Sequence, residues 1–155
     1  MRIRLISVGS KMPGWVEEGY HEYSRRLGHD LKLELVEVPL GRRSKGADIS
    51  RLQEKEAGQM LEAIGQGDRV VTLEIEGKPW NTEQLADTMA NWLHGGQNIS
   101  LLVGGPEGLH SFCMARADVR WSLSPLTFPH PLVRVVVAEQ VYRAWSILHN
   151  HPYHK

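Results

Sequence analysis

Short strand-like runs alternate with helical patterns along this chain, and this alternation restricts the fold more than any other feature. The β-branched and leucine-rich runs predict strands at residues 2–8, 31–38, 69–73, 98–103 and 119–123. The spacing of apolar residues predicts helices at 15–27, 48–64, 82–94, 111–117 and 132–150. The order indicates a three-layer α/β/α fold around a mainly parallel sheet of about five to six strands.

The composition is that of one globular domain, which we expect to span residues 1–155. The chain has 41% hydrophobic and 23% charged residues, enough for a core at this length. Its 18 basic residues balance 18 acidic ones, so no global positive field attracts nucleic acid. An RNA partner would have to meet local patches, such as Arg25 with Arg26, or Arg42 with Arg43 and Lys45. Each patch alone also fits ordinary solvated surface charge.

The location we expect is the cytoplasm. The apolar run at residues 3–8 is too short for a signal peptide, and no later run reaches the length of a membrane span. Cys113 is the only cysteine, so it cannot form an internal disulfide.

Ligands of such folds bind where strands end, which directs attention to the loops after Leu73, Val103 and Leu123. The loop at 104–108 reads GGPEG, and paired glycines let a ligand approach the backbone closely. It matches neither the dinucleotide fingerprint nor the phosphate loop, so a pyrophosphate ligand is disfavoured. Taken alone, the loop is equally well explained as a tight turn.

A second unusual connection, residues 121–131, contains three prolines among apolar side chains. Proline stiffens the backbone and removes hydrogen-bond donors, which suits a flat apolar slot for an adenine ring. The alternative is a stiff connector that ends in a helix with Pro131 in its first turn. A third loop, residues 41–46, is the one loose stretch of the chain and is expected to be mobile without substrate.

The segment at 132–150 is apolar on nearly every side, which is not typical of a surface helix. It is either buried in the domain or meets a second subunit. Glu139 and Arg143 have the spacing of a helix ion pair. Arg134 fits either a buried ion pair or a contact with an anionic ligand group, a phosphate or a carboxylate.

The C-terminal histidines follow the pattern H-x-H-x-x-H from His149 to His154, which raises the question of a metal site. A metal is disfavoured because no acidic or cysteine ligand is near in sequence. Together with Tyr153, the imidazoles are also suited to stacking on a base.

Several long strings resemble the knotted SPOUT methyltransferases, and the likeness extends over the whole chain. The strings are LVGGPEG at 102–108, SLSPLTFPH at 122–130, RVVVAEQ at 134–140, VGSKMP at 8–13, IEGKPW at 75–80 and NHPYH at 150–154. The resemblance implies a C-terminal trefoil knot, a homodimer and the cofactor S-adenosyl-L-methionine. It also implies the reaction: methylation at N3 of a pseudouridine in large-subunit (23S) ribosomal RNA, on the assembled ribosome. Carried over by position, the cofactor contacts are Leu73, Gly104, Leu123, Ser124, Pro125, Leu126, Thr127 and Phe128.

Methyl transfer needs an attacking nitrogen aligned behind the methyl carbon, and no metal is required. The ring nitrogen carries a proton, so a base would help. His130 is the first candidate base, and Glu139 would orient it or serve as the base itself. Arg134 would stabilise the uracil anion or position RNA. His151, Tyr153 and His154 would hold the nucleotide. For each residue, packing or capping explains its presence equally well, because alignment alone can be sufficient.

Two other interpretations of the sequence remain open. An α/β enzyme that binds an adenine nucleotide fits the alternation but lacks phosphate-binding glycines. A ribosome-binding module without catalysis fits the basic loop and the histidine tail, and it would show no cofactor-dependent activity.

Overall fold

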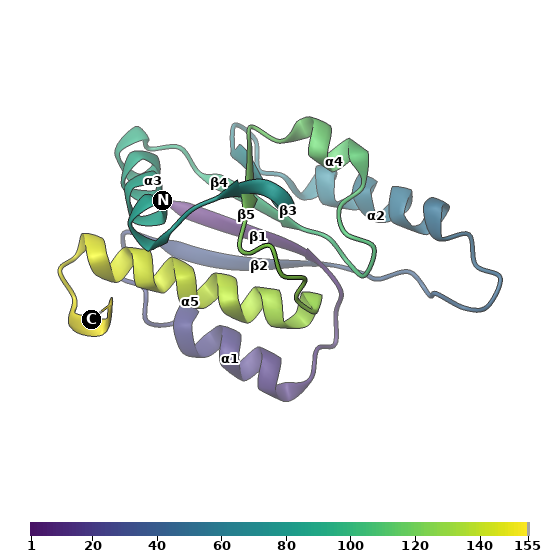
Figure 1. Ribbon diagram of the computed structural model, residues 1–155, viewed down its shortest axis with the longest axis horizontal. Coiled ribbons are helices and arrows are strands. Elements are labelled where there is room, and N and C mark those ends of the chain that lie inside the picture. Colours follow the sequence, from purple (N-terminus) through teal and green to yellow (C-terminus); the bar gives the residue numbers. More distant parts are fainter. Residues whose placement is uncertain (155) are drawn as a thin grey trace.

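The computed structural model describes residues 1–154, and Lys155 lies outside this range. Its centre is a five-stranded sheet in the order β2-β1-β4-β3-β5, and every neighbouring pair is parallel (Figure 1). The strands are β1 Arg2–Val8, β2 Lys32–Val38, β3 Arg69–Pro79, β4 Ile99–Val103 and β5 Val119–Ser122. The predicted α/β class, strand number and strand direction are therefore confirmed.

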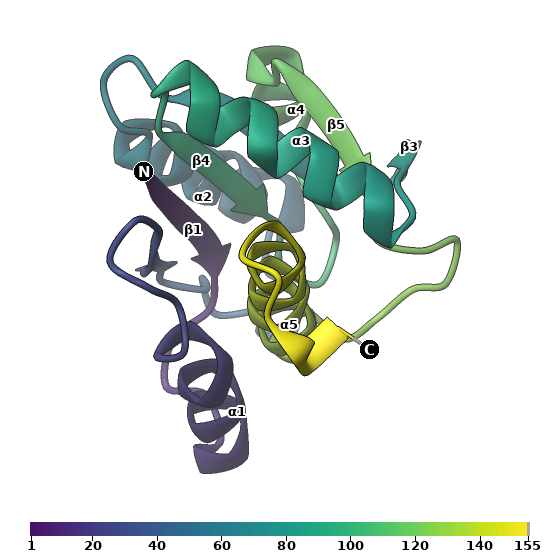
Figure 2. The same cartoon turned by 90° about the vertical axis from the view of Figure 1, so that its left-hand side faces the viewer.

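Helices cover both faces of the sheet, which gives the three predicted layers (Figures 1 and 2). They are α1 Gly14–Ser24, α2 Ile49–Ala63, α3 Thr82–Gly95, α4 Ser111–Arg116 and α5 His130–Leu148, followed by a short 3₁₀ helix, η1 Pro152–His154. One core joins α1, α3 and α5 to the sheet, with Tyr20, Met89 and Val137 among its buried residues. A second core joins α2 and α4 to the opposite face through Met60 and Cys113. Strands buried on both sides explain why their sequences are nearly continuous apolar runs.

The helix ends follow local capping chemistry. The Asn81 side chain accepts a hydrogen bond from the Gln84 backbone N–H at 2.8 Å, and the Gln84 side-chain oxygen accepts one from the Asn81 N–H at 2.9 Å. Asp48 caps α2 by accepting from the Arg51 N–H at 3.2 Å. These bonds satisfy backbone donors that the first helical turn leaves without partners.

Several boundaries differ from the sequence prediction by one to three residues, such as the end of α1 at Ser24, and two differences bear on the site. Strand β3 continues six residues beyond Leu73, and its pairing with β5 shifts register between Leu73 and Lys78. Glu74 to Gly77 do not form a continuous ladder there, so a strand pattern was hard to detect. Helix α5 begins at His130, two residues early, because Pro129 adopts an extended conformation and Pro131 is tolerated in the first turn.

Helix α5 is enclosed within the chain, which agrees with the first of its two predicted settings. Val137, Ala138, Val141 and Ala144 are at most 2% exposed, and the helix packs against α1, α3 and the tail helix η1. Its predicted ion pair is present, with Arg143 Nη2 2.7 Å from Glu139 Oε1. None of the described helices is long and apolar enough to cross a membrane. The C-terminal knot stays a prediction.

The shifted part of β3 provides a stability test. A Cβ atom on Gly77 would lie 2.6 Å from the backbone carbon of Trp121 and 2.8 Å from its nitrogen. Because backbone cannot move aside like a side chain, Gly77→Ala is expected to lower the free energy of unfolding by about 1–3 kcal/mol. The matched control is Gly58→Ala, in the exposed middle of α2 with open space around it. It is expected to raise that free energy by about 0.5–1 kcal/mol. Urea unfolding measures both, and equal changes would contradict this packing.

Candidate active site at the carboxyl edge of the sheet

Four neighbouring parallel strands, β1, β4, β3 and β5, end at one edge of the sheet. Three segments that are far apart in sequence meet there: the irregular part of β3 that begins at Leu73, and the loops that begin at Gly104 and Leu123. These segments surround a pocket of about 910 Å³. Ligands of such folds bind at the carboxyl ends of the parallel strands. The pocket lies where this rule predicts it.

Most of the predicted cofactor residues lie in this pocket. Its lining includes Leu73, Gly104, Leu123, Ser124, Leu126, Thr127 and Phe128. Pro125 is in the same loop but is not part of the lining. Other lining residues were not among the predicted cofactor contacts: Ile75, Glu76, Met114 and Val133. The string IEGKPW was a signal for the first two, while Met114 and Val133 are ordinary apolar helix positions that give no signal.

The glycine turn is folded tightly upon itself. A Cβ atom on Gly104 would overlap the backbone of Gly108 and lie 2.6 Å from the Leu109 nitrogen. Gly108 has a φ of +80°, a conformation that disfavours side chains, and its N–H donates to the Gly105 carbonyl at 3.0 Å. Both ends of this turn therefore require glycine, and bare backbone is exposed to the pocket.

The loop from Leu123 to Pro129 forms the opposite wall. Ser122 Oγ donates to the Ser124 carbonyl at 3.1 Å, and Ser124 Oγ accepts from the Leu126 N–H at 3.0 Å. These bonds and the prolines fix the loop shape. The Leu126 side chain is nonetheless 68% exposed, and a large apolar side chain at a pocket rim is available to a ligand or a second protein surface.

The charged groups of the lining are acidic. Glu74, Glu76 and Glu107 contribute to it, and none of the lining residues among 1–154 is a lysine or an arginine. Burial tends to raise the pKa of Glu74, but hydrogen bonds from Arg120 and Thr72 outweigh it and lower the pKa below its usual value. Glu74 and Glu107 pair with Arg120 and Arg43, which lie outside the lining, so their charges are balanced. Glu76 has no ion-pair partner among residues 1–154, and the lining offers no lysine or arginine to a phosphate.

His130 lines the pocket at the first residue of α5. Its Nδ1 atom is buried and has no hydrogen-bond partner among the described residues. Burial, and next the positive charges of Arg134 and Arg43, lower the pKa of His130. The imidazole is therefore neutral at physiological pH, and a neutral imidazole can accept a proton.

Arg134 does not line the pocket, and its guanidinium is bound within the chain. It is 1% exposed, and its Nη1 donates to Glu37 Oε2 at 2.9 Å. Its Nη2 lies 3.3 Å from both Ser7 Oγ and the Gly9 carbonyl. A Cβ on Gly9 would be 3.3 Å from the His130 ring, so this loop separates Arg134 from the pocket. The geometry favours buried pairing over direct contact with an anionic ligand.

Glu139 and the tail lie together, away from His130. Nine residues along a helix separate Glu139 from His130 by about 13 Å, so the two do not meet within one chain. Glu139 instead accepts from Arg143 Nε at 2.9 Å and from the Tyr153 hydroxyl at 3.0 Å. Burial and the contact with Glu139 raise the pKa of Tyr153 to about 12, so its hydroxyl stays protonated.

The other two predicted tail residues are His151 and His154. The His151 Nδ1 accepts from the Tyr153 N–H at 3.2 Å, and the His154 Nδ1 is buried without a partner among residues 1–154. Within residues 1–154, no three histidine, cysteine or acidic side chains are grouped so that they could hold a metal ion.

The comparisons with known proteins agree with this architecture. Residues 1–154 match the family model described as "Predicted SPOUT methyltransferase". A solved structure, "a probable methylase family protein from Haemophilus influenzae Rd KW20", superposes with a TM-score of 0.59 over 99% of this chain and 70% of that one, at 11% identity. That likeness supports the fold alone. The chain belongs to the SPOUT methyltransferase family.

Close relatives extend over the full length. A protein of Alkalilimnicola ehrlichii named Ribosomal RNA large subunit methyltransferase H is 61% identical over 155 residues, which are 100% of this chain and 99% of the relative. The proteins of the same name from Hahella chejuensis and Pseudomonas putida are 57% and 58% identical, with coverage of 99% and 100% of the relatives. Within the SPOUT family, the chain groups with these proteins.

The contacts of Arg134 predict its effect on stability. Arg134→Met removes a buried charge but leaves Ser7, Gly9 and Glu37 without their donor, so we expect a loss of about 2 kcal/mol in the free energy of unfolding. The loss is smaller than for a fully buried pair because Glu37 is 37% exposed. Arg25→Gln, in an exposed pair on α1, should change it by less than about 0.5 kcal/mol. Urea unfolding that shows no difference between the two variants would contradict a structural role.

Proposed function

We propose that this chain uses S-adenosyl-L-methionine to methylate the N3 position of a pseudouridine in large-subunit ribosomal RNA, acting in the cytoplasm on the assembled ribosome. The observation that carries the proposal is the convergence of Leu73, Gly104 and the Leu123–Phe128 loop on one pocket. Full-length relatives at 57–61% identity that are named as large-subunit ribosomal RNA methyltransferases support the substrate class.

The pocket fits the proposed cofactor. Its volume is at the upper end of the range for small-molecule sites, roughly 300–1000 Å³. The backbone of the glycine turn offers hydrogen bonds, while Leu123, Phe128 and Leu73 supply apolar contacts for an adenine ring. Glu76 of the lining offers a negative charge to a positively charged sulfonium. When bound, this group supplies an activated methyl carbon, and the chain has to align an acceptor with it.

His130 is the residue best placed to remove the N3 proton. It is the only proton acceptor among the three predicted catalytic residues that lines the pocket, and its lowered pKa keeps it neutral. Loss of the proton leaves negative charge on the uracil ring. The Arg134 guanidinium acts through the Gly9 loop rather than on the substrate, so we assign it a positioning role.

We further propose a homodimer in which the tail of one subunit completes the site of the other. In one chain, His151, Tyr153 and His154 lie at the far end of α5 from His130 (Figure 1). Tyr153 is fixed there by Glu139 and packs against the Tyr142 ring, at 4.6 Å between centroids. If these residues hold the nucleotide, they must act on a pocket contributed by a second copy.

The two alternative functions differ in what they require of the pocket. A nucleotide enzyme would need cations or free glycine N–H groups for phosphate, whereas the described lining carries carboxylates and neither lysine nor arginine. A ribosome-binding module without catalysis needs no small-molecule pocket at all. Methyl transfer accounts for both the pocket and the relatives.

The principal test is transfer of labelled methyl groups from S-adenosyl-L-methionine to ribosomes from cells that lack this protein. Intact ribosomes, separated subunits and free ribosomal RNA are compared. We expect label at one pseudouridine of the large-subunit RNA, with intact ribosomes as the best acceptor. Label elsewhere, or none despite measured cofactor binding, would overturn the assigned substrate.

Substitution of His130 tests the proposed base. His130→Gln should lower turnover at least roughly 100-fold while cofactor affinity changes little, because proton removal affects only the chemical step. The wild-type rate should fall as pH drops through the lowered pKa of His130, since the protonated ring cannot accept a proton. This acid limb, below the usual histidine pKa of about 6.5, should be absent in the variant. Rates over pH 4.5–8 from single-turnover assays provide the measurement.

The control is His94→Gln, an exposed residue near the end of α3, which should leave the rate unchanged.

The His130→Gln variant also tests whether two subunits share one site. Chains with His130→Gln mixed with chains carrying Tyr153→Ala should regain part of the wild-type activity, because a mixed dimer holds one intact combination. Recovery that never exceeds the sum of the separate variants would argue against a site built from two subunits.

A further inference from the structure

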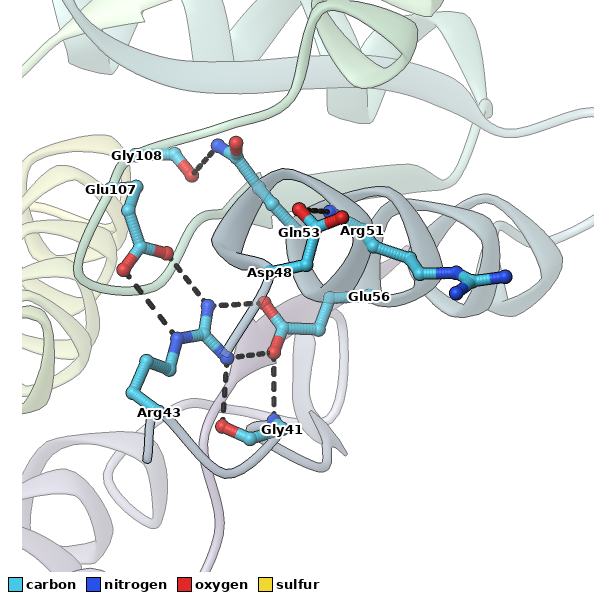
Figure 3. A network of polar contacts seen from close by, with 8 residues as sticks. All are labelled: Gly41, Arg43, Asp48, Arg51, Gln53, Glu56, Glu107 and Gly108. Carbon is cyan, nitrogen blue, oxygen red and sulfur yellow. Dashed lines mark hydrogen bonds and ion pairs between the residues drawn. The ribbon is translucent and has the colours of Figure 1, made fainter. Parts of the chain in front are cut away.

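The loop between β2 and α2, residues 41–46, is anchored by an arginine that faces inward. It has no regular secondary structure, and the sequence predicted a mobile basic patch. The Arg43 side chain is nevertheless only 17% exposed, and it contacts two carboxylates and one carbonyl (Figure 3). Arg43 is therefore not available as a solvated contact for RNA.

One half of the contact joins the loop to α2. Both Arg43 Nη atoms donate to the Glu56 carboxylate, with Nη2 2.8 Å from Oε1, and Nη1 also donates to the Gly41 carbonyl at 2.9 Å. The Gly41 N–H donates to Glu56 Oε2 at 2.7 Å. Burial tends to raise the pKa of Glu56, but the bonds from Arg43 and Gly41 lower it, so the carboxylate is charged. Glu56, at 4% exposure, is a fixed anchor.

The other half reaches the glycine turn of the pocket. Arg43 Nη2 lies 2.6 Å from Glu107 Oε1, and Nε lies 3.5 Å from Oε2. Glu107 lies between Gly105 and Gly108, in the turn that closes tightly on itself. A turn this compact moves as a unit, so an arginine fixed to Glu56 restrains the whole turn against α2. Gln53 adds a weaker contact, Nε2 to the Gly108 carbonyl at 3.3 Å.

We infer that Arg43 is a positioning residue that holds the glycine turn, through Glu107, in the conformation that binds the cofactor. The inference rests on the proposed function, because it assigns the pocket to S-adenosyl-L-methionine. It explains why a loop on the β2 side, outside the pocket lining, contains an arginine that faces inward. It also links the basic loop, with exposed Arg42 and Lys45, to cofactor affinity.

The test is a double-mutant cycle on Arg43 and Glu107, with S-adenosyl-L-methionine as the probe and isothermal titration calorimetry on the full chain. Arg43→Gln and Glu107→Ala should each raise the Kd about tenfold, and the double variant should raise it no further. Arg43→Lys keeps the charge but not the two-sided contact, so its Kd should be intermediate. Arg42→Gln, the exposed neighbour, should leave the Kd unchanged.

Hydrogen exchange distinguishes positioning from general destabilisation. Backbone amides at residues 104–109 should exchange faster in Arg43→Gln and in Glu107→Ala without cofactor, while those of β1 and β4 should not. Glu107→Ala keeps the Arg43–Glu56 pair, so it remains informative if Arg43→Gln unfolds. Additive losses in the cycle, or unchanged Kd and exchange, would overturn the inference. Failure of the wild type to bind would instead remove the proposed cofactor.

Discussion

Parallel pairing of neighbouring strands is the constraint on which the rest of this structure depends. Because β1, β4, β3 and β5 run in one direction, their carboxyl ends share one edge, and the chain must return across a face of the sheet after each strand. Those returns are the helices that bury both faces. The loops at the carboxyl edge lie outside this repeating pattern of strands and helices, and glycine and proline shape them into a pocket.

The features predictable from sequence are those that local chemistry controls. Strand and helix positions followed from apolar spacing, and the pocket followed from where strands end. Gly104 carried a signal because only glycine tolerates such close backbone approach, and Gly108 because its φ of +80° disfavours a side chain. The continuation of β3 gave none, because its register shift depends on Trp121 and Ser122, some 45 residues away in the chain. Pairing of that kind is a property of the assembled sheet.

Side-chain partners were the least predictable part of the site. Arg134 follows His130 by one helical turn, yet its guanidinium contacts Ser7 on β1, Gly9 just after it and Glu37 on β2. Arg43 lies in a run of basic residues typical of a solvated patch, yet it is held by Glu56 and Glu107. In both cases the carboxylate comes from a distant element. Sequence distance therefore could not tell a ligand-binding arginine from a structural one.

Charge pairing also bears on how a neutral chain selects a polyanionic target. Arg25, Arg26, Arg43 and Arg120 all contact carboxylates of the same chain, which reduces the positive charge offered to phosphate. Attraction between cations and phosphate does not depend on the RNA sequence, so it cannot by itself select one RNA. Binding then has to come from several simultaneous contacts arranged on a surface of matching shape. The pairing of these four arginines is therefore consistent with the proposed substrate, an RNA recognised by the shape of an assembled particle.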